Sequence, residues 1–214
     1  MSRIPKSRRG WLFVAFVGRV VFRLLGWTCT GEPPSPRKFV ILAAPHTSNW
    51  DGFFLILAAA MLKLEFSFFG KHTLFHGPLG WFLRHMGGLP LDRSRNQSFV
   101  SQAVSWFDAH ETFAIGVAPE GTRKITSGWR TGFYYIALQA KLPIFMGYID
   151  YATKKCGILP DILIPTGDID KDFESLRRLY APLTAKHPDR KGPIVPLPRT
   201  KGGALQTEGA LVGT

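Results

Sequence analysis

Residues 38–63 read KFVILAAPHTSNWDGFFLILAAAMLK, and this stretch decides the fold class. Its first seven residues form a short apolar run that favours a buried strand, and residues 49–63 form a longer run that favours a helix. The helix is apolar on nearly all sides, so we expect it to be buried in the core or pressed against lipid. A polar segment, 45–52, separates the two. The stretch therefore predicts a strand, a polar loop and a helix, the repeating unit of α/β proteins.

The rest of the chain continues this alternation. Two tandem prolines make residues 31–36 a linker, and residues 187–214 indicate a disordered tail because they are rich in Pro and Gly and have no apolar period. We expect an N-terminal segment at 1–30, one domain at 31–186, and an α/β fold with a mixed or parallel sheet flanked by helices. The further strands are expected at 64–69, 112–118, 142–151 and 156–164, and the further helices at 79–86, 96–109, 131–140 and 170–185.

Composition supports one globular domain. Of 214 residues, 45% are hydrophobic and 20% are charged, which argues against a disordered chain and against a polytopic membrane protein. The 27 Lys and Arg residues exceed the 15 Asp and Glu residues, and the net charge of +12 favours polyanions, anionic lipid surfaces or phosphorylated substrates without choosing among them. Cys29 and Cys156 match no metal-ligand spacing and no disulfide scaffold, so we expect a reducing intracellular setting.

The N-terminal segment combines basic and apolar residues. At 100° per residue, Arg8, Arg19 and Arg23 fall on one narrow stripe of a helix, and Trp, Phe, Val and Leu occupy the remaining arc. This layout is typical of an amphipathic helix that lies in a membrane interface. A helix packed on the domain and a signal or spanning segment are the alternatives. No run free of Asp, Glu, Lys and Arg approaches the roughly 20 apolar residues that a span needs.

The polar segment after the first strand contains His46 and Asp51, the first candidates for chemistry. Ligands of α/β proteins gather at the carboxyl ends of strands. Histidine can accept a proton near neutral pH, and a carboxylate can fix its tautomer. Asp51 lies five positions after His46, so on one regular helix their side chains would point about 140° apart. The two can therefore meet only if His46 lies in the loop and Asp51 in the first turn of the helix. The alternative is a turn histidine and an aspartate that stabilises the helix N-terminus.

A second candidate segment, Ala-Pro-Glu-Gly-Thr-Arg at 118–123, follows the strand predicted at 112–118. Glu120 and Arg123 would place a carboxylate and a guanidinium at the end of that strand, and arginine suits bidentate phosphate binding. A surface turn with an ion pair is the other interpretation. Two weaker segments are 87–93, a turn with a short strand, and 142–147, an ordinary core strand.

Taken in order, these four segments resemble the glycerolipid acyltransferase family, whose best-known members are the 1-acylglycerol-3-phosphate acyltransferases. That family carries an H-x-x-x-x-D block, a G-x-x-x-x-D-R-like block, an F-P-E-G-T-R block and a V-P-x-x-P-like block. The matching positions are His46 with Asp51, residues 88–93, residues 119–123, and Leu142 with Pro143. The resemblance covers about residues 38–150. It departs from the family pattern at Pro45, Ala118 and Met146, where many members have Asn, Phe and Pro.

The resemblance implies a membrane-associated O-acyltransferase. It would transfer a fatty acyl group from acyl-CoA or acyl carrier protein to a lysophospholipid, above all 1-acylglycerol-3-phosphate, to give phosphatidic acid. His46 would be the general base, and Asp51 would orient it and stabilise the imidazolium. The acceptor and its phosphate would contact Glu120, Gly121, Thr122 and Arg123, with Lys71 and Arg93 as further basic candidates.

No metal and no cofactor beyond the acyl donor are expected. His72, His76 and His85 lie close in sequence but have no carboxylates at ligand spacing. No covalent acyl-enzyme is implied, since neither Ser48 nor the cysteines have an argued role as nucleophile. The expected partners are a phospholipid membrane surface, the acyl donor and the lysophospholipid acceptor, without nucleic acid. The expected location is peripheral or monotopic on the cytoplasmic face of a membrane.

Three alternatives to this function stay open. The acceptor could be another lysolipid or glycerol 3-phosphate. The chain could be a non-enzymatic basic module that binds membranes or nucleic acid, although its basic residues are dispersed and match no recognised module. It could also be an acyltransferase of the H-H-x-x-x-D-G type. That motif fits less well because Pro45 precedes His46 and the spacing to Asp51 is one residue longer.

Overall fold

The computed structural model describes residues 8–85, 87–91 and 99–198, and a seven-stranded sheet lies at its centre. The order across the sheet is β1-β7-β6-β2-β5-β3-β4. In the described chain the β6–β7 pair is antiparallel and the other neighbouring strands are parallel, so the expected mixed sheet is confirmed. The strands are β1 (Thr28–Thr30), β2 (Lys38–Ala44), β3 (Ser67–Lys71), β4 (Gly88–Leu91), β5 (Phe113–Val117), β6 (Ile144–Asp150) and β7 (Lys155–Leu163).

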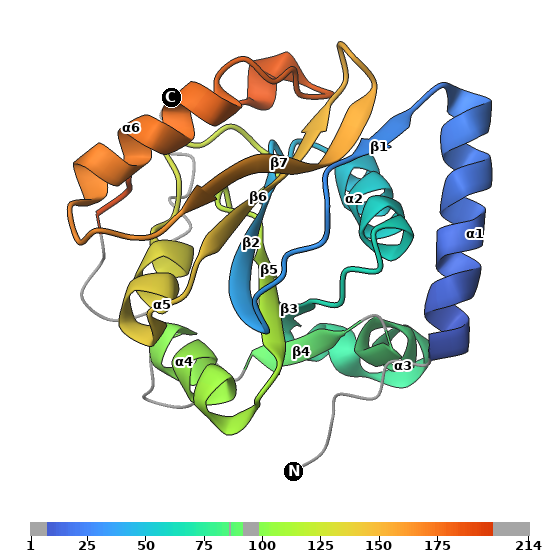
Figure 1. Cartoon of the computed structure of the whole chain (residues 1–214), viewed down its shortest axis with the longest axis horizontal. Helices are drawn as coiled ribbons and strands as arrows, with labels where there is room; N and C mark the ends of the chain where they lie inside the picture. The colour runs from blue at the N-terminus through green and yellow to red at the C-terminus, as the bar shows by residue number, and fades with distance from the viewer. Residues whose placement is uncertain (1–7, 86, 92–98, 199–214) are drawn as a thin grey trace, which may run out of the picture.

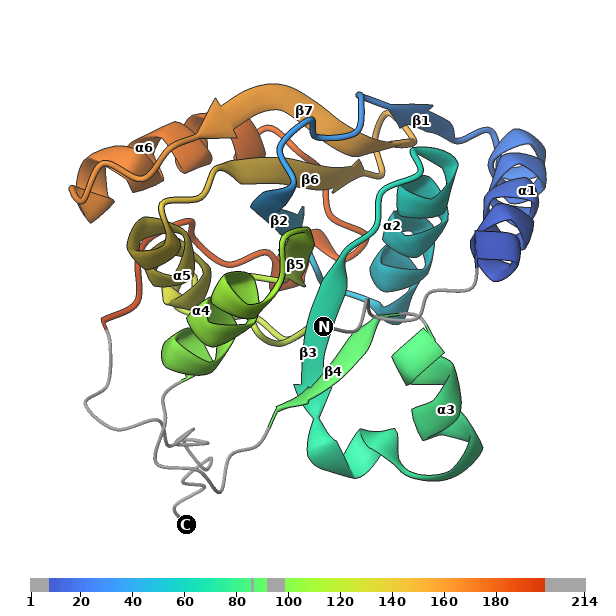
Figure 2. The ribbon, with the colours of Figure 1, turned by 60° about the horizontal axis from the view of Figure 1, so that its bottom comes forward.

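Helices cover both faces of the sheet (Figure 1). On one face lies α2 (Asn49–Met61), with α1 (Arg8–Leu25) packed against it. The other face carries α4 (Phe99–Ala109), α5 (Gly132–Ala140) and α6 (Ile169–Tyr180). Figure 2 shows α3 (Gly77–His85) beside β4, on the same side of the molecule as α1 and α2. The expected arrangement of helices flanking a sheet is therefore present.

The central strand β2 shows how the sequence builds two buried faces. Val40 and Leu42 join the large core under α4, α5 and α6, whereas Phe39 and Ile41 point toward the face that α2 covers. Successive side chains of a strand point to opposite faces, so a strand with helices on both sides must be apolar throughout. This explains the unbroken apolar run that marked β2 in the sequence.

Helix α2 begins and ends at capping residues. The Ser48 hydroxyl accepts a hydrogen bond from the Trp50 N–H, and Asp51 reaches back to the Ser48 N–H, which forms a capping box. At the other end Lys63 has a left-handed φ of 55°, and the N–H groups of residues 63 and 64 bond to carbonyls of the last turn. This C-terminal cap includes residue 64, so β3 begins at Ser67 and not at residue 64 as predicted.

Two further expected boundaries are wrong. β1 pairs with β7, so residues 28–30 belong to the sheet although we expected the domain to begin at 31. A strand of three residues is too short to show a periodic pattern. Helix α6 ends at Tyr180 and not at 185. Pro182 explains this end, because proline lacks the backbone N–H that would continue the helical hydrogen bonds.

The expected tail from 187 onward is also wrong for its first part. Residues 187–198 pack on the domain, and Ile194 is buried. The Trp129 N–H donates to the Val195 carbonyl at 2.8 Å, and the Leu197 N–H donates to the Trp129 carbonyl at 2.9 Å. Backbone hydrogen bonds attach this segment to the domain, so it is ordered without the periodic apolar pattern that we used to predict structure. The remainder of the expected tail, 199–214, lies outside the described residues.

Helix α1 is buried on one face and exposed on the other. Ala15 and Phe22 are buried, and a side chain at Gly18 would place its Cβ 3.0 Å from the Met61 sulfur of α2. Arg19 is exposed, as expected. In the described ranges, no helix has both the length and the apolar character needed to cross a membrane. The exposed large apolar side chains of α1 are Leu12, Phe13, Phe16, Val20, Leu24 and Leu25.

Candidate active site

The segments that follow β2 and β5 meet at one edge of the sheet. The two strands are parallel neighbours, so their carboxyl ends lie side by side. The backbone N–H of His46 donates to Glu120 Oε1 at 3.1 Å, and the Arg123 guanidinium donates to the Asn49 side-chain oxygen. The structure therefore brings together the two segments that the sequence singled out.

His46 and Asp51 are close but do not share a hydrogen bond. His46 lies in the loop before α2 and Asp51 in its first turn, the arrangement that the spacing required. The His46 Nδ1 is 3.9 Å from Asp51 Oδ2, beyond hydrogen-bond distance. Within the described residues, this buried Nδ1 has no hydrogen-bond partner. The carboxylate therefore acts on the imidazole through its charge.

Four donors surround the Asp51 carboxylate, which is fully buried. Oδ2 accepts from the N–H groups of Thr47 and Ser48, at 2.6 and 2.7 Å. Oδ1 accepts from the Ser48 hydroxyl and from the Tyr151 hydroxyl, both at 2.7 Å. A buried carboxylate is costly unless its oxygens are paired, and here both oxygens are. These bonds also explain why Asp51 does not turn toward the imidazole.

The surroundings of His46 favour a neutral imidazole. Burial lowers the pKa of His46 below its ordinary value of 6.5, and the positive charge of Arg123 lowers it further. The charge of Asp51 opposes both effects and raises this pKa. The neutral form is the one that can accept a proton, so His46 is available as a base near pH 7.

Glu120 is almost fully buried beside the same loop. Burial raises the pKa of Glu120 to about 7, and the nearby charge of Asp51 adds to this effect. Backbone N–H groups, including that of His46, and the charge of Lys191 oppose it. Among the described residues, Glu120 Oε2 is buried without a hydrogen-bond partner. Near neutral pH this carboxyl can therefore hold a proton.

Two basic side chains flank the first turn of α2. Arg123 is exposed, and the Lys186 ammonium lies 4.9 Å from the ring centroid of Trp50. Guanidinium and ammonium groups that solvent can reach suit a phosphate group. Sequence reasoning missed Lys186, since it lies in the segment after α6 and carries no motif.

The segment after α6 also supports the loop of His46. The His187 N–H donates to the Thr47 hydroxyl at 3.2 Å. The Lys191 ammonium donates to the carbonyls of Tyr180, Ala181 and Leu183, at the C-terminus of α6. This segment thus joins the helix end to the loop, although 140 residues separate His187 from Thr47.

The other predicted site residues have different positions. Gly121 has a φ of 66°, and a Cβ there would lie 2.5 Å from the Arg130 Nε. Thr122 accepts from the Lys124 N–H at 3.2 Å, within its own turn. Lys71 ends β3, but its side chain is outside the description, and Arg93 lies outside the described residues.

The three clustered histidines are described only in part. His72 and His76 are exposed, and the side chain of His85 is outside the description. In the described part of the chain, no group of three His, Cys, Asp or Glu residues could hold a metal ion.

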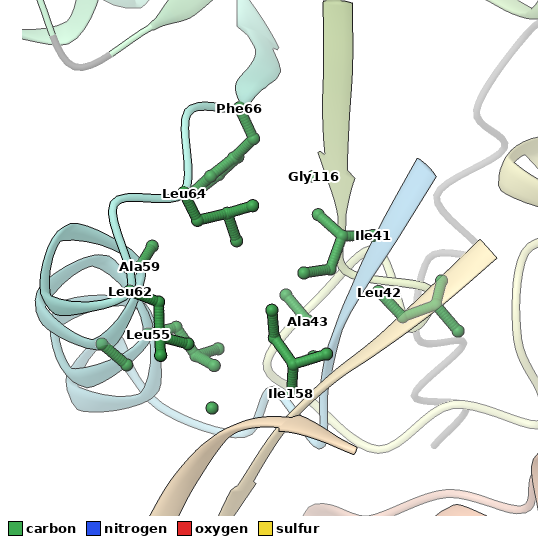
Figure 3. Close-up of a pocket in the computed structure, with 13 residues that line it drawn as sticks. Ile41, Leu42, Ala43, Leu55, Ala59, Leu62, Leu64, Phe66, Gly116 and Ile158 are labelled. Carbon is green, nitrogen blue, oxygen red and sulfur yellow. The ribbon is translucent and has the colours of Figure 1, made fainter. Parts of the chain in front are cut away.

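A narrow apolar pocket lies between α2 and the sheet (Figure 3), with a cavity volume of about 40 Å³. Glycines on this face of the strands leave the space open. Gly116 lies opposite Phe66, and a Cβ at Gly116 would lie 2.6 Å from the Phe66 ring. Near the other end lies Ala43, three residues before His46. The lining residues are Ile41, Leu42, Ala43, Leu55, Ala58, Ala59, Leu62, Leu64, Phe66, Gly116, Gly147, Gly157 and Ile158.

Comparison with known proteins shows what this chain is similar to. The sequence profile described as Acyltransferase matches residues 27–149, more than half of the chain. A 1-acyl-sn-glycerol-3-phosphate acyltransferase of Saccharomyces cerevisiae is 31% identical over 122 residues, covering 53% of this chain and 39% of that protein. An enzyme of the same name from Streptococcus pneumoniae is 27% identical over 143 residues, covering 62% of this chain and 52% of that protein. The chain thus spans about half the length of these relatives or less.

A solved structure has the same fold. The crystal structure of the 1-acyl-sn-glycerophosphate acyltransferase PlsC from Thermotoga maritima superposes with a TM-score of 0.54 at 22% sequence identity. The match covers 79% of this chain and 74% of that one. It confirms the expected α/β architecture.

Proposed function

Since its residues 27–149 match the Acyltransferase profile, the chain belongs to the acyltransferase family, and we propose that it acylates the free hydroxyl of 1-acylglycerol-3-phosphate. The donor is a fatty acyl thioester, either acyl-CoA or acyl carrier protein, and the products are phosphatidic acid and a free thiol. The observation that carries this proposal is the imidazole of His46 at the carboxyl edge of the sheet, with its Nδ1 3.9 Å from Asp51 and its backbone N–H bonded to Glu120. Both curated relatives carry this substrate in their names.

The proposed reaction passes one proton through His46. The imidazole takes the proton of the acceptor hydroxyl while the oxygen attacks the thioester carbonyl. The carbon–sulfur bond then breaks, and the thiolate leaves with the proton from the imidazolium. Asp51 stabilises that imidazolium through its charge, 3.9 Å from Nδ1. A positioned base of this kind contributes roughly 10²–10⁴-fold to the rate.

Arg123 and Lys186 bind the phosphate of the acceptor in this proposal. Arg123 contacts Asn49 and Lys186 contacts Trp50, the first two residues of α2, which follow the loop that carries His46. A phosphate between two cations directs the glycerol hydroxyl toward the base. Glu120 accepts a hydrogen bond from the His46 N–H and shapes the acceptor site by holding this loop.

The acyl chain of the donor enters the pocket between α2 and the sheet. This pocket is lined almost wholly by apolar side chains and glycines, as a fatty chain requires (Figure 3). It reaches Ala43, near the loop of His46. A chain held there would place its thioester at the carboxyl edge of the sheet.

The exposed apolar face of α1 binds a phospholipid surface in this proposal. Phe13 and Phe16 are 67% and 61% exposed, and Trp81 of α3 is 64% exposed. Helices α1 and α3 lie on the same side of the molecule (Figures 1 and 2). Large exposed apolar side chains gathered on one side mark an interaction surface. A lysophospholipid acceptor lies in a membrane, so we propose peripheral attachment on the cytoplasmic face, where both donors occur.

The test is thiol release from a long-chain acyl-CoA and from an acyl carrier protein donor, in mixed micelles. We expect release that requires 1-acylglycerol-3-phosphate and falls about 10²–10⁴-fold in His46→Ala. His110→Ala is the control, because His110 stacks on Trp106 at the far end of α4. Equal transfer in His46→Ala would contradict the base. Preference for glycerol 3-phosphate or another lysolipid would overturn the acceptor, and absence of release with every acceptor and both donors would overturn the function.

A further inference from the structure

We propose that Tyr151 is a positioning residue for the His46–Asp51 pair. Its hydroxyl holds the Asp51 carboxylate in place by a hydrogen bond, and so fixes the position of the negative charge that acts on the His46 imidazole. Neither the family blocks nor the sequence analysis assigns a role to this tyrosine. The proposal rests on the proposed function, because it refines how the same pair works.

The tie from Tyr151 reaches Asp51 from a distant part of the chain. Tyr151 follows β6, and its hydroxyl donates to Asp51 Oδ1 at 2.7 Å across 100 residues of sequence. The other three donors in the described chain come from Thr47 and Ser48, within the loop of His46 itself. Tyr151 therefore links the carboxylate to the sheet, whereas the other donors move with the loop.

Packing holds the Tyr151 ring in place. The ring of Trp27 meets it edge-on, with 5.0 Å between centroids and 87° between planes. Trp27 is itself stacked on Phe54 of α2 at 4.3 Å. The Tyr151 N–H donates to the Thr184 carbonyl at 2.9 Å. Because both the ring and the backbone of Tyr151 are held, its hydroxyl has a defined position. A group that orients a reacting pair needs such a fixed position.

The Tyr151 hydroxyl is a permanent donor to the carboxylate. Burial raises the pKa of Tyr151 far above its ordinary value, and Asp51 raises it further, so the phenol keeps its proton while His46 titrates. A hydrogen bond to a carboxylate stabilises its charged form. Without this bond, the His46–Asp51 pair would bind a proton more tightly.

Other charged and titratable groups also face this pair, and the test must leave them unchanged. Glu120 and Arg123 face it from the segment after β5. Cys156 faces Tyr151 from β7, and Lys191 faces Glu120 from the segment after α6. Exchange of tyrosine for phenylalanine alters none of these groups.

The experiment compares Tyr151→Phe with the wild type in the acyl-transfer assay as a function of pH. We expect kcat to fall about 10- to 100-fold with little change in KM, because the reacting pair is misplaced while binding is intact. We expect the acidic limb of the profile to move by about half a pH unit to higher pH. Tyr148→Phe is the matched control, since this β6 hydroxyl bonds to Thr30 at 2.7 Å, and its limb should not move.

A second readout needs no activity. The ring protons of His46 can be followed by NMR against pH and assigned by their loss in His46→Ala. Tyr151→Phe should raise the midpoint of this titration, and it should have no further effect in an Asp51→Asn background. An unchanged midpoint, an equal shift in Tyr148→Phe, or a full effect in the Asp51→Asn background would overturn the proposal. Failure of acyl transfer in the wild type would overturn the proposed function and leave this titration interpretable.

Discussion

The two faces of the sheet differ in what covers them. Under α4, α5 and α6 the strands contribute full-sized side chains to a continuous core that includes Phe133, Tyr134 and Phe173. Under α2 the strands carry glycines at 116 and 147, and a pocket remains. Close packing is what stabilises a fold, whereas a ligand needs space. The packed face therefore supplies the stability that permits an incompletely filled second face.

The largest expected effect is a loss of stability from a substitution in the core under α4, α5 and α6. Phe133 is fully buried and lies 6.1 Å, ring to ring, from Phe173. Phe133→Ala should lower the free energy of unfolding by about 3–5 kcal/mol, through lost burial and a cavity. Denaturant unfolding measures this loss, and kcat of the protein that stays folded should be unchanged. If folded Phe133→Ala protein had a reduced kcat, this would contradict the assignment of stability to one face and of the site to the other.

The next effect concerns Glu120, at the carboxyl edge of the sheet, and the pH dependence of stability. Glu120 has a pKa of about 7 in the folded chain against an ordinary value of 4.5, so the folded state binds its proton more tightly. The contribution of Glu120 to the stability of the wild type should therefore fall as pH rises from 4.5 to 7. Glu120→Gln does not titrate, so its stability relative to the wild type should rise by about 1–3 kcal/mol between pH 5 and pH 8.

Urea unfolding at the two pH values tests this. Glu174→Gln is the matched control, because Glu174 is exposed on α6 and pairs with Arg177 at the surface. Its stability should follow that of the wild type at both pH values. If the Glu120→Gln and wild-type curves ran parallel, ionisation of Glu120 would not destabilise the fold.

The smallest expected effect concerns the pocket under α2 and the acyl-chain length that it accepts. Phe66 lies against Gly116 at one end of the pocket, so Phe66→Ala should lengthen it. We expect the preference between long and short acyl donors to shift about tenfold toward the longer, the size expected for one or two methylenes in an apolar site. Competition between donors of different length measures this. Phe69→Ala is the control, because its ring packs on Phe99 on the opposite face, and an equal shift there would contradict the assignment.

Local patterns predicted most of the fold. The strand Lys38–Ala44 and the start of α2 at Asn49 were found from apolar runs, because strands and helices buried on all sides have little polar sequence. β1 was missed, since three residues depend on pairing with β7 for their structure. Residues 187–198 were missed for the same reason, because partners elsewhere in the chain hold their backbone.

The site was predicted where its residues adjoin in sequence. The loop position of His46 and the helical position of Asp51 followed from the strand-to-helix context. Ser48 and Asp51 have the spacing of a capping box, a signal that could have shown that the carboxylate is already bonded to its own loop. Tyr151 and Lys186 gave no such signal, since they reach the loop from distant segments.

The hydrogen bond from His187 to Thr47 spans 140 residues and has a consequence for synthesis on the ribosome. Closing so long a loop is entropically costly and must wait until the second partner has emerged. The β2–α2 unit can form early, but its reactive loop acquires its last tie only when almost all of the described chain has been translated. Nascent chains that stop before α6 therefore carry His46 and Asp51 on a loop that lacks this hydrogen bond.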